Sequence, residues 1–272
     1  VLVRNVSTPA KEYLPMLSPD NELLFFTRVS QVKAKGDIVS RDVEELTEAR
    51  RVDVHADFDA GRSLPDPFNL GDSYGGLTIS VNNQEMFVTV CGPPDAKGYR
   101  NCDIHRSHYE TMFDLDVGPN INTPDGWESQ PSLSADGNTL YFATIRPNTE
   151  GIDIIESKRD PQGGWSPARP VKGINTAGDE KAPFMHSDSR TLYFAAKPPS
   201  DESGRVDASR GHRGIGGYDI FFSKLNDDGS WTRPKNLGHP FNTDQDEPGL
   251  VVSADGRTAY FASARYKGAG DL

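Results

Sequence analysis

The sequence predicts an all-β fold, a five-bladed β-propeller built of four-stranded antiparallel blades. Three observations support this prediction. One short phrase recurs five times along the chain. The 272 residues include 26 Gly and 20 Pro, a composition rich in turns that suits many short strands. The first residues of the chain also match the strand that would complete the last copy of the repeat.

The repeated phrase joins a short apolar run, a tight turn and an aromatic strand. Asp, Asn, Gly and Ser favour turns, and aromatic and β-branched residues favour strands. Each copy is therefore predicted to be a β-hairpin. The five copies are 17–27, 79–89, 133–143, 185–195 and 252–262.

A third and a fourth strand are predicted after the hairpin. The third strand is placed at 52–56, 102–106, 152–156 and 218–222, and the fourth is clearest at 165–176 and 231–243. Residues 43–50, in the long insertion before the first of these third strands, could form two helical turns. Four antiparallel strands of this size make one propeller blade. Residues 1–8 align with the fourth strand at 169–176, so we predict five blades closed by the N-terminal strand, with six blades as the alternative.

Composition and charge restrict the partners and the location. The formal net charge of −11 disfavours nucleic acid and anionic membranes as partners, because their phosphates repel an acidic chain. No apolar run approaches the roughly 20 residues needed to cross a bilayer, so direct membrane insertion is not expected. We expect a single propeller domain, 1–272, cut from a longer multidomain protein.

Several phrases carry a family resemblance that spans essentially the whole chain. They are SADGNTLYFAT with GIDIIES, WSPARPVKGINTAGDE, and GIGGYDIFFSKLNDDGSW. They resemble the TolB-like, WD-type propeller repeats of OmpA-associated outer-membrane lipoproteins of Bacteroidetes-type bacteria, including the PorE-like component of the type IX secretion system. The resemblance implies a periplasmic, non-catalytic interaction scaffold at the outer membrane, with peptidoglycan held by another domain. The second copy departs from the pattern, because its turn lacks Asp-Gly and its unit lacks Trp.

Blade geometry separates two faces of the ring. Connections between second and third strands emerge on one face, here named the loop face, and the long insertions 28–51, 92–101, 146–151 and 197–217 all fall there. Variable loops on a rigid scaffold commonly carry function, so envelope or secretion-system proteins are expected to dock on this face. Cationic candidates for that contact are Arg205, Arg210, His212 and Arg213, which could pair with carboxylates of a partner protein or a glycan. The alternative is a solvated loop.

A Glu recurs just before the first strand of four copies, at Glu12, Glu128, Glu180 and Glu247. The first strand is innermost in a propeller, so these carboxylates are candidates for a ring at the channel mouth that attracts a cation or an amine. The alternative is that each Glu caps main-chain amides of its own blade. A recurring third-strand Asp, at 53, 103, 153 and 219, is expected to tie neighbouring strands or loops together.

The two cysteines are candidates for a disulfide. Cys91 ends a second strand and Cys102 begins the next third strand, which brings antiparallel neighbours within disulfide range. A disulfide would place the domain in an oxidising compartment, whereas two free thiols would suit a reducing cytosol. No metal is expected, because His105 and His108 lie on a strand whose side chains alternate between faces.

No short catalytic motif is present, so we expect a chain that is not an enzyme and has no cofactor. The sequence therefore favours an interaction scaffold. Two alternatives remain: a propeller that binds a carbohydrate or small ligand at the channel mouth, and a gating propeller of a peptidase of the prolyl oligopeptidase type.

Overall fold

The computed structural model describes residues 2–33, 39–71, 73–108, 111–114, 117–124, 126–265 and 272, with the backbone alone for 111–114. Every regular element of these residues is a β-strand. No segment of the described chain forms a helix long and apolar enough to cross a membrane.

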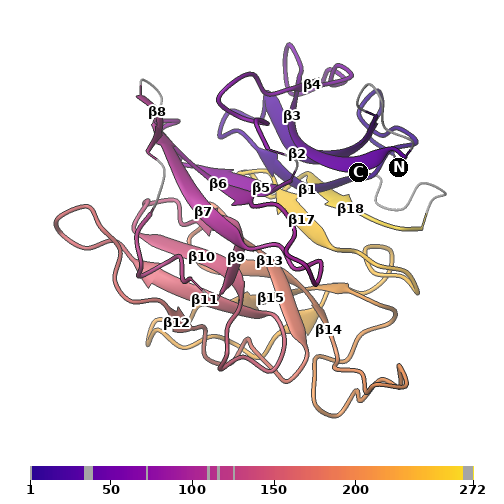
Figure 1. Cartoon of the computed structure of the whole chain (residues 1–272). Coiled ribbons are helices and arrows are strands. Elements are labelled where there is room, and N and C mark those ends of the chain that lie inside the picture. The colour runs from indigo at the N-terminus through magenta and orange to yellow at the C-terminus, as the bar shows by residue number, and fades with distance from the viewer. Residues whose placement is uncertain are drawn as a thin grey trace.

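Four sheets are antiparallel blades whose four strands follow the order of the sequence (Figure 1). Blade 1 contains β1 (Glu12–Leu17), β2 (Leu23–Val32), β3 (Arg41–Arg50) and β4 (Arg62–Ser63). Blade 2 contains β5 (Tyr74–Ile79), β6 (Glu85–Cys91), β7 (Cys102–His108) and β8 (Thr111–Asp114). Blade 3 contains β9 (Trp127–Leu133), β10 (Thr139–Ile145), β11 (Asp153–Lys158) and β12 (Arg169–Pro170). Blade 4 contains β13 (Asp179–Met185), β14 (Thr191–Lys197), β15 (Asp219–Lys224) and β16 (Lys235–Asn236).

The predicted number of blades is wrong, both as five and as the alternative of six. The described residues form four four-stranded blades and one two-stranded sheet, β17 (Gly249–Val252) with β18 (Ala259–Ala262). β17 contacts both β1 and β13, so it lies between the first and fourth blades. The fifth copy of the repeat thus supplies an inner hairpin, and no third strand is described beside it. The N-terminal segment does meet the far end of the chain, because the Val3 amide donates to the Leu272 carbonyl at 3.0 Å.

The third strand of blade 1 is also not where the sequence placed it. β3 pairs residue by residue with β2 from Leu23 opposite Arg50 to Val32 opposite Arg41. Residues 52–56 form a turn instead, and 43–50 are extended rather than helical. Leu46 and Ala49 are three residues apart, so in a strand their side chains point to opposite faces, and each is fully buried in a different core cluster. Burial on both faces of β3 therefore explains the strand.

The core repeats with the blades. The second strand of each full blade contributes one phenylalanine that is fully buried between neighbouring sheets, at Phe26, Phe87, Phe142 and Phe194. Burying a side chain of this size stabilises the fold by about 1.5–3 kcal/mol. The same position recurs because each blade packs on the next with the same geometry.

The centre of the ring is narrow and apolar. The inner strands of the four full blades each have a residue at positive φ beside a register shift, namely Leu14, Gly76, Gln130 and Ala182. These bulges and the residues after them approach the axis together with Gly249 and Leu250, and they leave a cavity of only about 30 Å³. A space of this size holds no more than a few water molecules.

Candidate functional site

The four recurring glutamates are buried inside the blades and do not form an open ring. Each carboxylate has no exposed surface. Glu128 shows the arrangement: it accepts hydrogen bonds from the Thr123 amide at 3.2 Å, the Thr123 hydroxyl at 2.9 Å and Arg146 Nε at 2.9 Å. The Arg146 Nη2 atom then donates to the Ile121 carbonyl at 2.6 Å. The carboxylate thereby ties the start of the inner strand to the end of the second strand.

The same group of contacts, which we call the Thr–Glu–Arg clip, recurs around the ring. Its Thr–Glu–Arg members are Thr8, Glu12 and Arg28 in blade 1, Thr123, Glu128 and Arg146 in blade 3, and Thr243, Glu247 and Arg265 beside β17. A buried carboxylate must be paired or hydrogen-bonded, and here each one has several donors. The channel-mouth role predicted for Glu12, Glu128, Glu180 and Glu247 is therefore corrected: their oxygens are used within the fold.

Blade 4 replaces the arginine of the clip with a histidine. Thr176 donates to Glu180 through its amide at 2.8 Å and its hydroxyl at 2.5 Å. His212 Nε2 lies 3.7 Å from the Glu180 carboxylate and 2.6 Å from the Ile174 carbonyl, the position that an arginine Nη2 occupies elsewhere. Burial raises the pKa of Glu180 to about 7, and burial also lowers the pKa of His212. The Glu180 carboxyl group of this clip therefore titrates near neutral pH.

Three of the four cationic candidates are exposed on the last long insertion, residues 198–218. Arg205, Arg210 and Arg213 face solvent, and Arg210 pairs with Glu150 of the preceding insertion at 2.7 Å. His212 differs, because its ring packs against Phe194 and Phe221 within the blade. The structure therefore separates His212, a part of the fold, from three arginines that a partner could reach.

This insertion is folded rather than a loose arm. Ser200 and Val206 form an antiparallel bridge, and the Asp201 side chain accepts hydrogen bonds from Arg205 and Ser203 amides, each at 2.9 Å. Asp219, at the start of the next strand, accepts from the amides of Ile215 and Gly216 and so closes the other end. The loop holds its arginines in a defined place.

A disulfide fixes the insertion of blade 2. Cys91 and Cys102 are joined, and they face each other as the last pair of the β6–β7 ladder. Within the insertion, the Asp95 amide donates to the Tyr99 carbonyl at 2.8 Å and the Gly92 amide donates to the Asn101 carbonyl at 2.8 Å. The bond closes the base of a loop on the loop face.

A polar groove on the loop face was missed by the sequence reasoning. It has a volume of about 460 Å³ and lies between the β2–β3 hairpin and the disulfide-closed insertion; its lining residues are Lys11, Tyr13, Val29, Asp42, Glu44, Ser73 and Arg100. The Tyr13 and Ser73 hydroxyls both donate to the Glu44 carboxylate. Burial, and then the Glu44 charge, raise the pKa of Tyr13, so this hydroxyl stays protonated.

The groove could be predicted only if Arg41–Arg50 was recognised as a strand. Asp42 and Glu44 are two residues apart on β3, so their side chains lie on the same face. The sequence reasoning treated them as part of a loop or a short helix, where no shared face is implied. The polar residues alternating with Val43 were the available signal.

A basic cluster lies at the start of the inner strand of blade 4. Lys181 Nζ is 3.7 Å from the centre of the Tyr218 ring, and Lys197 Nζ is 4.5 Å from it. The Tyr218 hydroxyl donates to Asp179 at 2.8 Å, and Lys197 pairs with the same carboxylate at 3.2 Å. Burial, with a smaller effect of Lys197, lowers the pKa of Lys181 to about 8. The cluster offers a partly dehydrated ammonium group to an anion.

Comparisons with known proteins show the fold. No protein-family model and no curated protein matches the chain. Among solved structures, TolB from Acinetobacter baumannii is 13% identical with a TM-score of 0.50, over 98% of this chain and 54% of that one. A β-1,2-mannobiose phosphorylase from Listeria innocua is 10% identical with a TM-score of 0.59, over 96% and 91% of the two chains. An α-L-arabinofuranosidase from Lactobacillus brevis is 13% identical with a TM-score of 0.54, over 98% and 88%.

The expectation that the chain is not an enzyme is contradicted by these comparisons. Its structural neighbours include glycoside hydrolases and a phosphorylase as well as TolB. Propeller enzymes can assemble a site from loops that are distant in sequence, so the lack of a short motif was a poor argument against catalysis. At identities of 10–13%, the likeness shows a β-propeller fold and assigns no activity.

Proposed function

We propose that this chain is a protein-interaction propeller that binds its partner on the loop face. The observation that carries the proposal is that the long, ordered insertions lie on one face of the ring. The long β2–β3 hairpin, the disulfide-closed insertion 92–101 and the folded insertion 198–218 all lie on this face. The polar groove lies between the first two of these features, whereas the centre of the ring is closed by apolar residues.

The chemistry of the face favours a partner with carboxylates. Arg205, Arg210 and Arg213 are exposed in a chain whose net charge is −11, and they project from a folded insertion. Arginine is suited to such contacts because its planar guanidinium binds a carboxylate with two hydrogen bonds. The Lys181 cluster adds a second cationic group near the axis.

We propose that the domain lies in the periplasm. The Cys91–Cys102 disulfide supports this location, because structural disulfides persist in oxidising compartments. The family resemblance of the repeats supports the finer proposal that the domain belongs to a longer, outer-membrane-associated lipoprotein. Peptidoglycan would be held by an OmpA-like domain of that protein, and the partners would be envelope or type IX secretion proteins.

Charge reversal on each face tests the proposal. Arg205, Arg210 and Arg213 are changed together to Glu, and a matched variant changes the exposed Lys158, Lys224 and Arg257 of the opposite face. Capture of envelope proteins on immobilised domain is quantified by mass spectrometry. We expect the loop-face variant to lose a specific partner at least about tenfold and the matched variant to keep it. Equal capture by both variants would refute docking through these arginines.

Carbohydrate binding in the polar groove is a second candidate function. Asp42 and Glu44 lie on one face of β3 and line the same groove. Residues two apart on a strand are roughly 6.6 Å apart, and glycoside-cleaving sites use two carboxylates on either side of the scissile bond. The similarity of this fold to the folds of two sugar-processing enzymes supports considering a carbohydrate as the ligand.

Titration calorimetry with oligosaccharides and assays with nitrophenyl glycosides separate the two functions. Carbohydrate binding predicts a signal that Glu44→Gln removes while the arginine variant retains it. If no oligosaccharide binds and no glycoside is cleaved, this second candidate is excluded and the protein-docking proposal is unaffected.

A further inference from the structure

The axis of the ring ends in an apolar pocket on the turn face, the face opposite the loop face. The pocket has a volume of about 130 Å³. Each of the five repeat copies contributes the last residue of its inner strand and the residue two positions later; these later residues are Pro19, Val81, Ala135, Ser187 and Ala254. Met16 and Phe184 line both this pocket and the small closed cavity at the centre of the ring, so the pocket has an apolar floor.

Hydrogen bonds between neighbouring copies hold the walls of the axial pocket in place. The Met185 amide donates to the Ser132 hydroxyl at 2.8 Å, which joins blade 4 to blade 3. The Ser187 hydroxyl donates to the Ala254 carbonyl at 3.3 Å, which joins blade 4 to the β17–β18 hairpin. The pocket is therefore formed before any ligand arrives, as is usual for small-molecule sites.

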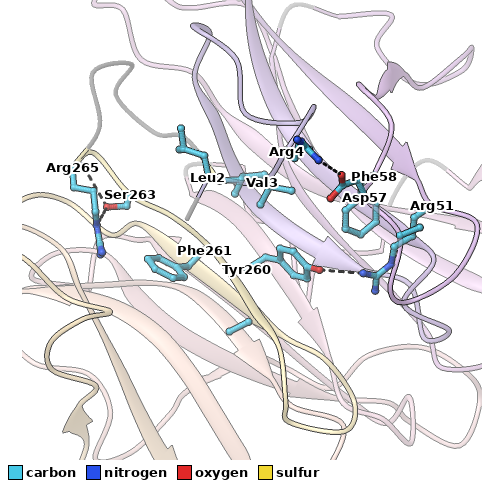
Figure 2. Close-up of a pocket in the computed structure, with 13 residues that line it drawn as sticks. Leu2, Val3, Arg4, Arg51, Asp57, Phe58, Tyr260, Phe261, Ser263 and Arg265 are labelled. Carbon is cyan, nitrogen blue, oxygen red and sulfur yellow. Dashed lines mark hydrogen bonds and ion pairs between the residues drawn. The ribbon is translucent and has the colours of Figure 1, made fainter.

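The groove between β18 and the N-terminal segment is larger, about 450 Å³, but has a different character (Figure 2). Figure 2 shows that two of its arginines are already bound within the fold, Arg4 to Asp57 at 3.1 Å and Arg51 to the Tyr260 hydroxyl at 3.3 Å. None of the described residues that line the axial pocket is charged. The axial pocket is thus the one of the two that suits an apolar group.

The size and the lining of the axial pocket fit a small apolar body. An engineered dry cavity of about 150 Å³ lined by Leu, Ile and Phe binds benzene. The axial pocket has a similar volume and similar walls, and it opens to solvent beside Val81, which is exposed. An aromatic ring or a short alkyl chain therefore fits it.

Carboxylates lie around the mouth of the axial pocket. The residue after each of the five wall positions is exposed, and it is Asp20, Asn82, Asp136, Asp188 or Asp255. A hydrogen bond from the Ser18 hydroxyl lowers the pKa of Asp20, and one from the Ser253 hydroxyl lowers the pKa of Asp255. These carboxylates are therefore charged at neutral pH.

Cationic side chains neutralise only part of this charge. Arg257 Nε lies 4.0 Å from the Asp255 carboxylate. Arg190 pairs instead with a carboxylate of the β15–β16 turn at 2.7 Å. In the described part of the chain, Asp20 and Asp136 accept hydrogen bonds only from their own turns. The mouth of the pocket is thus negative.

We propose that the axial pocket binds a small cation with an apolar body, of the chemical class of aromatic and alkyl ammonium ions. The apolar body occupies the pocket, and the ammonium group stays at the mouth in the field of Asp20 and Asp136. The same field repels an anion. The site lies on the turn face, away from the clip glutamates and the long insertions, so this inference is independent of docking on the loop face.

Three probes with the same ring test the proposal: benzylammonium, benzyl alcohol and phenylacetate. Each is titrated at neutral pH and low ionic strength, and binding is followed by saturation-transfer NMR. A carboxylate about 10 Å from an ammonium group in water contributes a factor of about two in affinity, so we expect benzylammonium to bind at least about threefold more tightly than benzyl alcohol. Phenylacetate should bind most weakly. Equal Kd values for the three probes, or no saturable binding of benzylammonium, would overturn the proposal.

Removal of charge at the mouth tests the role of the carboxylates. Asp20→Asn with Asp136→Asn keeps the turns intact, because Asn82 accepts the equivalent serine hydroxyl at 2.7 Å in the second copy. This variant should bind benzylammonium about fourfold more weakly and benzyl alcohol unchanged. A control with the same change in net charge is Asp95→Asn with Asp201→Asn on the loop face. Equal losses of benzylammonium affinity in the two variants would refute a site at the turn-face mouth.

Leucine at a wall position tests the pocket itself. Ala135→Leu and Ala254→Leu each fill the space from a different sheet, and urea unfolding verifies that each variant is folded. Each should weaken benzylammonium and benzyl alcohol at least about tenfold, because the ring can no longer be buried. Unchanged binding of benzylammonium in both variants would contradict the proposal, and it would leave partner docking on the loop face untouched.

Discussion

The two faces of the ring come from the same repeat, but the copies agree on one face and differ on the other. On the turn face, opposite the loop face, the serine hydroxyl of the hairpin turn bonds an Asp or Asn two residues later in four copies, at Ser18, Ser80, Ser134 and Ser253. On the loop face, one copy has a long hairpin, one has a disulfide and one has a folded insertion. Residues that recur therefore stabilise the ring, and residues that differ form the surface available for recognition.

The clip glutamates recur although they are not on the turn face. They lie toward the loop face, yet they recur, and their carboxylates are hydrogen-bonded within the fold. Recurrence thus predicts a structural role more reliably than location does.

Truncation of a clip glutamate should be severe. Glu128→Ala leaves buried donors of Thr123 and Arg146 without their acceptor, and breaking a buried ion pair costs about 3–5 kcal/mol. Glu150→Ala removes an exposed partner of Arg210 and should cost less than about 1 kcal/mol. Urea denaturation measures both. Similar losses for the two variants would contradict the structural role of the clip.

Loss of the disulfide should be the next largest effect. Cys91 and Cys102 close a short loop, and the entropic model gives about 3 kcal/mol for a loop of this length. The double variant Cys91→Ala with Cys102→Ala should lose that stability and show faster hydrogen exchange in 92–101. An unchanged denaturation midpoint under reducing conditions would argue that the bond has no structural importance.

The histidine clip of blade 4 should make stability depend on pH. Burial raises the pKa of Glu180 to about 7 from 4.5, so between these values the unfolded chain has lost a proton that the folded chain retains. Stability from this group is therefore greatest below pH 4.5, falls as the pH rises, and levels off above about 7. The slope is at most about 1.4 kcal/mol per pH unit.

Glu180→Gln should remove that slope. Below its usual value of 6.5, the lowered pKa of His212 contributes in the opposite direction, and the neighbouring Asp153 and Asp179 also act on Glu180. The difference between wild type and variant, measured by urea unfolding from pH 5 to 8, isolates the carboxyl group. Parallel pH profiles for the two proteins would show that Glu180 does not titrate in this range.

A turn-face substitution should have the smallest effect. Asp136 accepts the Ser134 hydroxyl at 2.5 Å and the Asn138 amide at 3.0 Å in an exposed turn. Asp136→Ala should cost about 1 kcal/mol, the usual net contribution of such hydrogen bonds, and leave partner binding unchanged. A loss of binding without a loss of stability would place a recognition role on the turn face.

Much of the fold was predictable because the repeat carries it. The hairpin phrases fix the first two strands of every copy, and the register of Cys91 with Cys102 follows from two adjacent strands. The number of complete blades was not predictable, because it depends on pairing beside β18 that the repeat alone does not supply. The third strand of blade 1 was missed because β2 and β3 extend beyond the ring and Arg41–Arg50 lacks the apolar pattern of the other copies.

The candidate site was predictable only in part. The long insertions and their arginines were visible as departures from the repeat. The roles of Glu12, Glu128, Glu180 and Glu247 required three-dimensional contacts, since a recurring Glu before an inner strand fits an open ring or a buried clip equally well. The groove around Glu44 combines residues from β1, β3 and the start of blade 2, which no local pattern connects.

Site-specific photocross-linking shows which face of the ring contacts a partner. A benzophenone amino acid is placed at Tyr99 or Val206 on the loop face and, as a matched control, at Val81 on the turn face; all three side chains are exposed, by 44%, 57% and 55%. The domain is then irradiated in an envelope fraction. Docking through the loop face predicts discrete adducts from Tyr99 and Val206 and none from Val81. Adducts that form from Val81 alone would contradict it.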